Sequence, residues 1–462
     1  MQNPELRRAL GPWAAIAVVI GTTIGSGIFL VPTQMIRAVG SPAKVFEVWI
    51  FGGILTLFGA LTYAELSAAM PGAGGEYVYL NAAYGPFFGF IYGWTQTWVA
   101  KAASIATLAT GFFYYLADFF PGLAGVVYTV PLPIGAHGAP LEIRYGQVVG
   151  ILLILFLAGI NYLGVRVGGA VQIVVTVVKV SLIAGVIVAG LLSSRGNAAN
   201  FSAAMPAHPG GIEGFFVALV AALWAYDGWN NAGMLGSEIV RPQKNLPRAL
   251  ILGTLVIMAI YLLANLTYFY ILSGPEVGAS QRVAADAMRR VLGPPGGVIV
   301  SIAAMISIFA ALNGSILSGS RIPYAMARDG YFFHSLGRVH PRFRTPAASI
   351  VLLGVWSSVV LLSGQYDQLY TLVIFPSWIL YGMTAASVIV LRHKRPDMER
   401  PYRVIGYPLV PLVFVLVAVA LLYSTFRTSP RESGIGLGLI IVGLPFYFHW
   451  KRQVQGSRAI PG

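Results

Sequence analysis

The stretch GTTIGSGIF at residues 21–29 decides how this chain is interpreted, because three glycines fall within seven residues in the middle of an apolar run. Pro32 follows about one turn later. Glycine weakens a helix by about 1 kcal/mol relative to alanine, so Gly25, Ser26 and Gly27 together make local unwinding easy. The stretch therefore predicts a helix that is interrupted at its middle.

The composition around this stretch predicts a membrane protein. Of the 462 residues, 57% are hydrophobic and only 10% are charged, whereas soluble domains contain roughly 45–50% apolar and about 25% charged residues. So few charges do not cover a water-facing surface. The chain has no cysteine, which excludes disulfide bonds, a disulfide-linked subunit, thiolate metal sites and thiol catalysis.

Apolar stretches separated by turn signals predict twelve transmembrane helices. They are expected at 12–36, 45–69, 86–117, 145–163, 167–192, 212–237, 248–272, 297–320, 346–363, 368–391, 406–426 and 434–450. An even number of spans puts both termini on one side. The first run starts too late for a signal peptide and lacks a cleavage site of small residues, so it is expected to be retained.

The basic residues predict the orientation. The net charge is +14, but the basic residues fall in short clusters between apolar runs, so nucleic acid binding is not expected. Nineteen Lys and Arg lie in the segments on the side of the termini and nine on the other side, with two inside spans. Because short cytoplasmic loops collect Lys and Arg, both termini are predicted to be cytoplasmic, in a protein of the plasma or inner membrane.

A second interruption, WAYDGWNN at residues 224–231, falls in the predicted sixth span. In lipid, backbone groups must be paired, so a break at membrane depth frees amides and carbonyls to face a cavity. The half-helix that resumes near Ile28 presents amides suited to a carboxylate. Carbonyls near the two breaks suit an ammonium group, and the candidates are those of Thr22, Thr23, Ile24, Trp224 and Ala225.

Such a site matches a zwitterion. The alternative is that these small residues only allow close helix packing. Breaks in spans one and six, the corresponding members of two five-span halves, favour a transporter's binding site over that alternative.

Six motifs, in order, resemble those of the amino acid–polyamine–organocation permeases, and in particular the L-type amino acid transporters and their bacterial relatives. The motifs are GTTIGSGIF at 21–29 with Pro32, YAEL at 63–66 with Met70 and Pro71, GGEY at 74–77, Trp229 with Asn230, Glu238 with PQKNLPR at 242–248, and Asn313 and Gly314 with Ser320, Arg321 and ARDG at 327–330.

The resemblance implies an all-α membrane protein in which spans one to five and six to ten are inverted repeats and two further helices are peripheral. It implies a transporter core over residues 1–400, and two peripheral helices with a cytoplasmic C-terminus over 401–462. It also implies alternating access around a central site.

The resemblance also implies the residues of that site. The substrate-binding set is Thr23, Gly25, Ser26, Gly27, Ile28, Trp224, Ala225 and Asp227. The gating or coupling set is Lys179, Trp229, Asn230 and Asn313. Asp227 departs from the family, in which several relatives carry glycine. Its carboxylate either points into the cavity, favouring cationic substrates, or caps the half-helix resuming near Gly228, and the cap is the favoured alternative.

Lys179 lies in the middle of the fifth predicted span. A lone cation at membrane depth costs about 2.5–3.5 kcal/mol, so the lysine must find partners. Carbonyls released by the first break and polar groups of span eight are expected. In sodium-coupled proteins of this fold a sodium ion joins spans one and eight, and the resemblance implies that the lysine replaces it. A proton-linked role and a purely structural tether remain open.

Several other polar residues and one amphipathic segment lie near the predicted spans. Lys101 is expected to extend to polar surroundings without a site role. Ser315 and Ser318 are expected to hold helices together rather than line a cavity. Glu65, Glu76 and Glu238 are candidates for salt-bridge latches or ordinary ion pairs. The weakly amphipathic segment 276–292 is expected to be a helical loop resting on the bundle, with closure of an outer vestibule as the alternative.

The function predicted from the sequence is secondary transport of small or neutral L-amino acids, as a sodium-independent exchanger. The alternatives are proton-coupled uptake of cationic amino acids or polyamines, and a nutrient sensor built on a transporter fold. No enzymatic site, ATP-binding loop, metal or cofactor is expected. The expected partners are an amino acid substrate and the lipid bilayer.

Overall fold

The computed structural model describes residues 5–131, 141–363 and 366–458, and most of these residues are helical. The α-helices are α1 (Pro12–Thr23), α2 (Gly27–Val39), α3 (Pro42–Ala69), α4 (Glu76–Tyr84), α5 (Pro86–Thr95), α6 (Lys101–Leu116), α7 (Tyr145–Tyr162), α8 (Val165–Leu191), α9 (Gly211–Tyr226), α10 (Asn231–Met234), α11 (Pro242–Ile271), α12 (Gly274–Ala279), α13 (Val283–Leu292), α14 (Pro294–Gly319), α15 (Arg321–Arg328), α16 (Ala347–Leu362), α17 (Tyr366–Lys394), α18 (Leu409–Thr428), α19 (Pro430–Val442) and α20 (Leu444–Arg458).

The remaining elements are short. They are a π-helical turn η1 (Gln96–Ala100), the 3-10 turns η2 (Pro121–Ala124), η4 (Ala198–Ser202) and η5 (His334–Gly337), and the antiparallel strands β1 (Val126–Val130) and β2 (Leu141–Arg144). In this hairpin Val126 lies opposite Arg144, and Val130 lies opposite Leu141.

The helices make this chain a multi-pass membrane protein. Within the described residues, nine helices are long and apolar enough to cross a bilayer. The pair α1 and α2 passes the same test as one span bent by 41°. Two shorter apolar helices, α9 and α16, accompany them. Each of the twelve apolar stretches predicted from the sequence lies on one or more of these helices.

Local sequence sets several helix starts and ends. Proline occupies the first turn of α1, α3, α5, α11 and α14, where its missing N–H removes no helical hydrogen bond. The C-cap of α2 is Gly40 in the left-handed conformation (φ 80°), which glycine adopts without a steric penalty.

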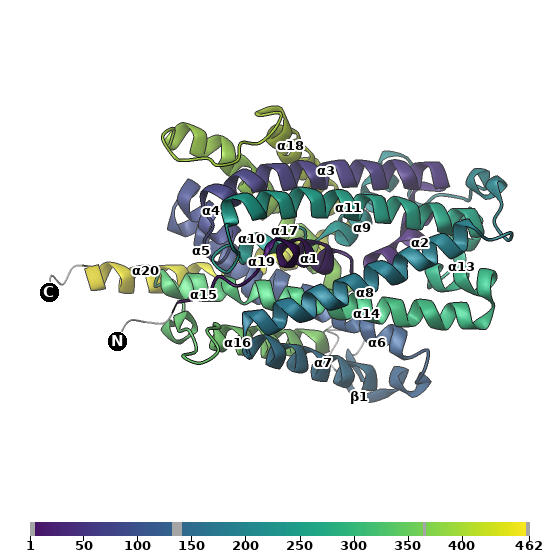
Figure 1. The fold of residues 1–462 in the computed structure, drawn as a ribbon, viewed down its shortest axis with the longest axis horizontal. Helices are drawn as coiled ribbons and strands as arrows, with labels where there is room; N and C mark the ends of the chain where they lie inside the picture. Colours follow the sequence, from purple (N-terminus) through teal and green to yellow (C-terminus); the bar gives the residue numbers. More distant parts are fainter. Residues whose placement is uncertain (1–4, 132–140, 364–365, 459–462) are drawn as a thin grey trace.

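The arrangement puts the first break inside the bundle. Helix α1 packs against α8, α11 and α14, and α2 packs against α9. Figure 1 shows α1 near the middle of the molecule, with the long helices running in roughly the same direction around it. Both termini lie at one end of the bundle, which is termed the terminal end, whereas α13 and β1 lie toward the opposite end (Figure 1).

The segment 276–292 forms parts of α12 and α13, which rest on the bundle. Val277, Ala284 and Met288 are almost fully buried. Arg282, which precedes α13, forms an ion pair with Asp118 and donates a 2.8 Å hydrogen bond to the carbonyl of Tyr114. The segment is therefore fastened to the end of α6, at the end of the bundle away from the termini.

Candidate functional site

The first break occupies Ile24 to Ser26, between α1 and α2. Ile24 leaves the helical conformation with ψ at 92°. Gly27 begins the next half-helix, and a Cβ added there would lie 2.7 Å from the Cα and Cβ of Ala225. The two interrupted helices therefore meet at Gly27. The first span is broken just before this glycine, and the glycine itself allows the close contact with the sixth span.

The second break follows α9. Asp227 is extended (ψ 147°), and Gly228 has a φ of +102°. A Cβ on Gly228 would approach the carbonyl oxygen of Thr22 to 3.0 Å. Thr22 donates from Oγ1 to the carbonyl of Gly228 at 2.8 Å. Because glycine alone adopts this conformation readily, Gly228 lets the sixth span turn against the first.

The two breaks enclose a cavity in the interior of the bundle. Spans one, three, six and eight supply its lining, which consists of Thr22, Thr23, Gly25, Ser26, Gly27, Ser104, Leu108, Trp224, Asp227, Gly228, Asn231 and Ser315. Its volume is about 20 Å³, and a cavity needs at least about 10–15 Å³ to hold one water molecule. The site is therefore closed around its centre and must widen to take a solute the size of an amino acid.

Asp227 faces this cavity. Its Oδ1 accepts a 2.8 Å hydrogen bond from the hydroxyl of Tyr381 on α17. Helix α10 begins later, at Asn231, with Asn230 as its N-cap residue and no side-chain capping bond. The favoured prediction of Asp227 as the cap of the resuming half-helix is therefore wrong, because the chain makes a further turn before that helix begins.

Lys101 lies beside this region and reaches polar surroundings, as expected. Its side chain is buried, and Nζ donates a 2.8 Å hydrogen bond to Oδ1 of Asn231, which lines the cavity. Lys101 also interacts electrostatically with Asp227. A lysine on an isolated apolar helix would extend toward water, but in this bundle the adjacent polar groups of the sixth span provide partners inside the protein.

Lys179 reaches the first break from α8. Its ammonium group donates to the carbonyls of Gly21, at 2.8 Å, and Ile24, at 2.6 Å. From α14, Ser307 Oγ donates to the carbonyl of Ile24 at 2.9 Å. Two helices thereby supply donors to carbonyls at the break.

Tyr261 on α11 contacts carbonyls of both breaks. Its hydroxyl lies 3.1 Å from the carbonyl oxygen of Thr23 and 2.6 Å from that of Ala225. One hydroxyl proton serves one acceptor at a time, so this tyrosine bridges the two interrupted spans. No pattern in the sequence pointed to it, because an aromatic residue in a long apolar helix resembles ordinary core.

The cavity contains most, but not all, of the residues predicted to bind substrate. Thr23, Gly25, Ser26, Gly27, Trp224 and Asp227 line it, together with Ser315, which was expected to hold helices together. Ile28 and Ala225 are buried beside the breaks and are not part of the lining.

The residues predicted to gate or couple lie around the cavity rather than in it. Trp229 packs edge-on against Tyr63, with ring centroids 4.7 Å apart. Asn313 donates to Oε1 of Gln172 at 2.8 Å and accepts from Asn161 at 2.9 Å. This amide cluster ties α14 to α7 and α8.

Asn230 connects the sixth span to Glu76 at the start of α4. Glu76 is buried and accepts hydrogen bonds from Asn230 Nδ2 and, at 3.0 Å, from the hydroxyl of Tyr92. Burial raises the pKa of Glu76 to about 7, although the two donors act in the opposite direction. The expectation of a salt bridge at Glu76 is wrong for the described part of the chain, since the hydrogen-bond partners of Glu76 there are uncharged.

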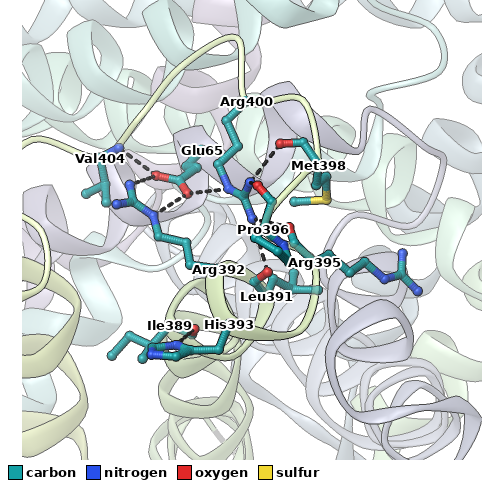
Figure 2. A network of polar contacts seen from close by, with 10 residues as sticks. All are labelled: Glu65, Ile389, Leu391, Arg392, His393, Arg395, Pro396, Met398, Arg400 and Val404. Atoms are coloured by element: carbon teal, nitrogen blue, oxygen red, sulfur yellow. Dashed lines mark hydrogen bonds and ion pairs between the residues drawn. The ribbon is translucent and has the colours of Figure 1, made fainter.

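The other two candidate glutamates do form ion pairs. Glu238 makes a two-pronged pair with Arg321, at 2.8 and 2.9 Å, and both side chains are fully buried. Glu65 accepts from Arg392 and from the backbone N–H of Val404, as Figure 2 shows. These pairs join α3 to α17 and the end of the sixth span to α15.

Three lining residues were not singled out from the sequence. Ser104 and Leu108 lie on α6, one turn apart and near Lys101, and Asn231 follows the second break. Ser104 and Leu108 sit in an apolar helix with no breaker or charge of their own to distinguish them. Within the described residues, no group of three or more His, Asp or Glu gathers as metal ligands.

Two interrupted spans that meet at a closed internal cavity, within a bundle of membrane helices, are typical of secondary transporters. The comparisons with known proteins give the family. The family model for amino acid permeases matches residues 10–444, so the chain belongs to the amino acid permease family.

Characterised relatives match along nearly the whole chain. The serine/threonine exchanger SteT of Bacillus subtilis is 34% identical over 98% of this chain and 99% of its own. The b(0,+)-type amino acid transporter 1 of Mus musculus is 32% identical over 97% of this chain and 89% of its own. The human cystine/glutamate transporter is 29% identical, over 97% and 86% respectively. The family and these relatives are transporters rather than enzymes.

Proposed function

We propose that this protein is an exchanger of small neutral L-amino acids that works by alternating access. The observation that carries the proposal is the meeting of the two breaks at a buried cavity lined by backbone and small polar groups. The amides near Gly25, Ser26 and Gly27 bind the substrate carboxylate, and carbonyls of the two breaks other than those of Gly21 and Ile24, which Lys179 contacts, receive its ammonium group.

The charge balance of the cavity favours neutral substrates. Asp227 would attract a cationic side chain, but its carboxylate already accepts from Tyr381 and lies in the field of Lys101. The other lining side chains near Lys101, Ser104 and Asn231, are neutral and polar. A substrate with a small hydroxyl-bearing side chain suits this lining, and the likeness to a serine/threonine exchanger agrees with it.

Lys179 supports sodium independence. Its ammonium already occupies the carbonyls of Gly21 and Ile24, so a fixed cation stands where a mobile one would otherwise neutralise the break. Replacing sodium by choline should leave uptake unchanged.

The finer architecture belongs to the same proposal. Counting the bent pair, the shorter helices α9 and α16 and the nine long helices gives twelve spans. Spans one to five and six to ten form two inverted repeats over residues 1–400, and residues 401–462 carry the peripheral helices. Both termini face the cytoplasm, because the basic loops lie on their side, and the protein resides in the plasma or inner membrane.

Transport in proteoliposomes tests the function. Labelled serine is expected to enter faster when unlabelled serine is trapped inside, and neutral amino acids should compete. Competition by arginine or putrescine, together with dependence on an imposed pH gradient, would instead support proton-coupled uptake of cations. Saturable binding without any uptake would support a sensor, and the absence of uptake of all twenty standard amino acids would refute the proposal.

A further inference from the structure

A second, larger cavity opens at the terminal end of the bundle, between α15, η5 and the start of α16. Its volume is about 890 Å³. Its lining includes four basic side chains, Arg328, His334, Arg338 and His340. Nothing in the amino acid site described above uses these residues.

Within the described residues, the two arginines of this cavity form no ion pair with a carboxylate. Arg328 and Arg338 are exposed. Two acidic residues, Asp329 and Glu5, line a neighbouring hollow that shares Arg328 with this cavity. There Asp329 accepts from the hydroxyl of Tyr77 at 2.9 Å.

One ring nitrogen of His340 is occupied within its own loop. Its Nδ1 accepts the backbone N–H groups of Arg342 and Phe343, both at 3.2 Å. The proton of the neutral ring therefore resides on Nε2. The cavity thus offers two guanidinium groups and an imidazole N–H, with no carboxylate in its lining.

The cavity lies at the depth where membrane helices end. The continuous helical segment formed by α14 and α15 ends at Arg328, and α16 begins at Ala347, which lines the cavity. Figure 1 shows α15 at the same end as α20 and the two termini. Basic side chains at this level face the phosphate layer of a bilayer.

An aromatic hollow adjoins the basic cavity. It has a volume of about 710 Å³ and shares Ala327, Gly330 and His334 with the first. Phe333 and Phe446 contribute to its lining with 53% and 42% of their surface exposed, beside the buried Trp450 of α20. A small soluble anion would use the basic residues alone, whereas a phospholipid would use both hollows.

We propose that these two hollows form a binding site for an anionic phospholipid of the leaflet at the terminal end. Its phosphodiester binds Arg328 and Arg338, with His334 and His340 as further donors. Its glycerol and first acyl carbons cover Phe333 and Phe446. Held there, the lipid connects α15, which carries Arg321 of the buried Glu238–Arg321 pair, to α16 and α20.

Thermal unfolding of the full-length purified protein in detergent tests the proposal. Added phosphatidylglycerol is expected to raise the Tm, and phosphatidylcholine at the same concentration should not. The double variant R328Q/R338Q should bind phosphatidylglycerol about 25-fold more weakly, from about fivefold for each basic residue near an anionic surface. High salt should reduce the shift of the unmodified protein.

The matched control is R395Q/R403Q, which removes the same charge from two exposed arginines outside both hollows; it should keep the full shift. The single variant H334Q, at the boundary of the two hollows, provides an independent test if the double variant does not fold, and it should weaken the shift as well. The proposal would be overturned if R328Q/R338Q or H334Q kept the full Tm shift with phosphatidylglycerol. It would also be overturned if phosphatidylcholine or inorganic phosphate shifted the Tm of the unmodified protein equally.

Discussion

At the scale of single residues, the site depends on close backbone contacts at glycines. Gly27 brings the start of α2 against Ala225, and Gly228 takes a left-handed conformation against Thr22. Both positions leave no room for a side chain at the place where the two spans must separate and rejoin. Glycine at these two positions therefore allows a close approach of the two spans that no larger residue would allow.

The first prediction concerns Gly27. The substitution Gly27→Ala places a methyl group against the backbone of Ala225, and overpacking of this kind costs about 1–3 kcal/mol. The variant is expected to lower the Tm and to abolish serine exchange. The control Gly185→Ala lies in α8 with nothing within 4 Å of the added carbon and should behave like the unmodified protein. Normal exchange by the Gly27 variant would refute the close contact.

Lys179 gives the second prediction. Lys179→Met keeps most of the side-chain volume but removes the donors to Gly21 and Ile24, and an unsatisfied buried acceptor costs about 1–3 kcal/mol. We expect a lower Tm and loss of exchange, measured in detergent and in proteoliposomes. If sodium restored exchange in this variant and had no effect on the unmodified protein, the lysine's role as the fixed cation would be supported directly. Unimpaired exchange without sodium would contradict it.

At the scale of elements, Glu76 joins α4, α5 and the segment after the second break. Burial raises its pKa to about 7. A carboxyl whose pKa is raised on folding stabilises the fold while it is protonated, and this stability is lost as pH rises from about 4.5 to about 7. Above that range the folded state keeps a buried charge.

The third prediction concerns the loss of stability with rising pH that Glu76 causes. The Tm of the unmodified protein should fall as pH rises through 7, and Glu76→Gln, which resembles the protonated form, should remove that part of the fall. The exposed Glu399 offers the control Glu399→Gln, which should keep the dependence. Thermal unfolding from pH 5 to 8 measures all three proteins. Identical profiles for the unmodified protein and Glu76→Gln would show that Glu76 does not titrate in this range.

At the scale of the whole molecule, ion pairs fasten both ends of the bundle around a nearly closed cavity. Arg282 and Asp118 hold the α13 region to the end of α6, and Glu238 and Arg321 hold the opposite end. Under the proposed alternating access, one of these ion pairs must release while the other holds. The small central volume fits a state in which both are closed.

The fourth prediction uses the absence of cysteine from the chain. A cysteine introduced by Ser104→Cys would be the sole thiol and would line the cavity. A charged, membrane-impermeant thiol reagent should label it slowly. Adding Asp118→Asn should speed labelling from the side of α13, and adding Glu238→Gln should speed it from the terminal end.

The second of these double variants should also be the less stable one, since breaking a buried ion pair costs about 3–5 kcal/mol. If labelling increased equally from both sides in either variant, the two ion pairs would not close the two ends of the bundle independently.

The sequence by itself determined the class of protein, the location of the long apolar helices and the two breaks. These features depend on local properties: runs of about twenty apolar residues, and glycines that weaken a helix wherever it packs. The sequence also indicated that Lys179 needed buried partners, because a charge in lipid is costly in any fold.

Only the tertiary structure decided which side chains share the cavity. Ser104 and Tyr261 lie in apolar helices and Asn231 lies at the end of the second interruption, and their roles come from helices far apart in the chain that meet there. Asp227 was misread for the same reason. Whether a charged side chain extends to water, caps a helix or lies in a cavity depends on what its neighbours offer, and those neighbours are adjacent in space rather than in sequence.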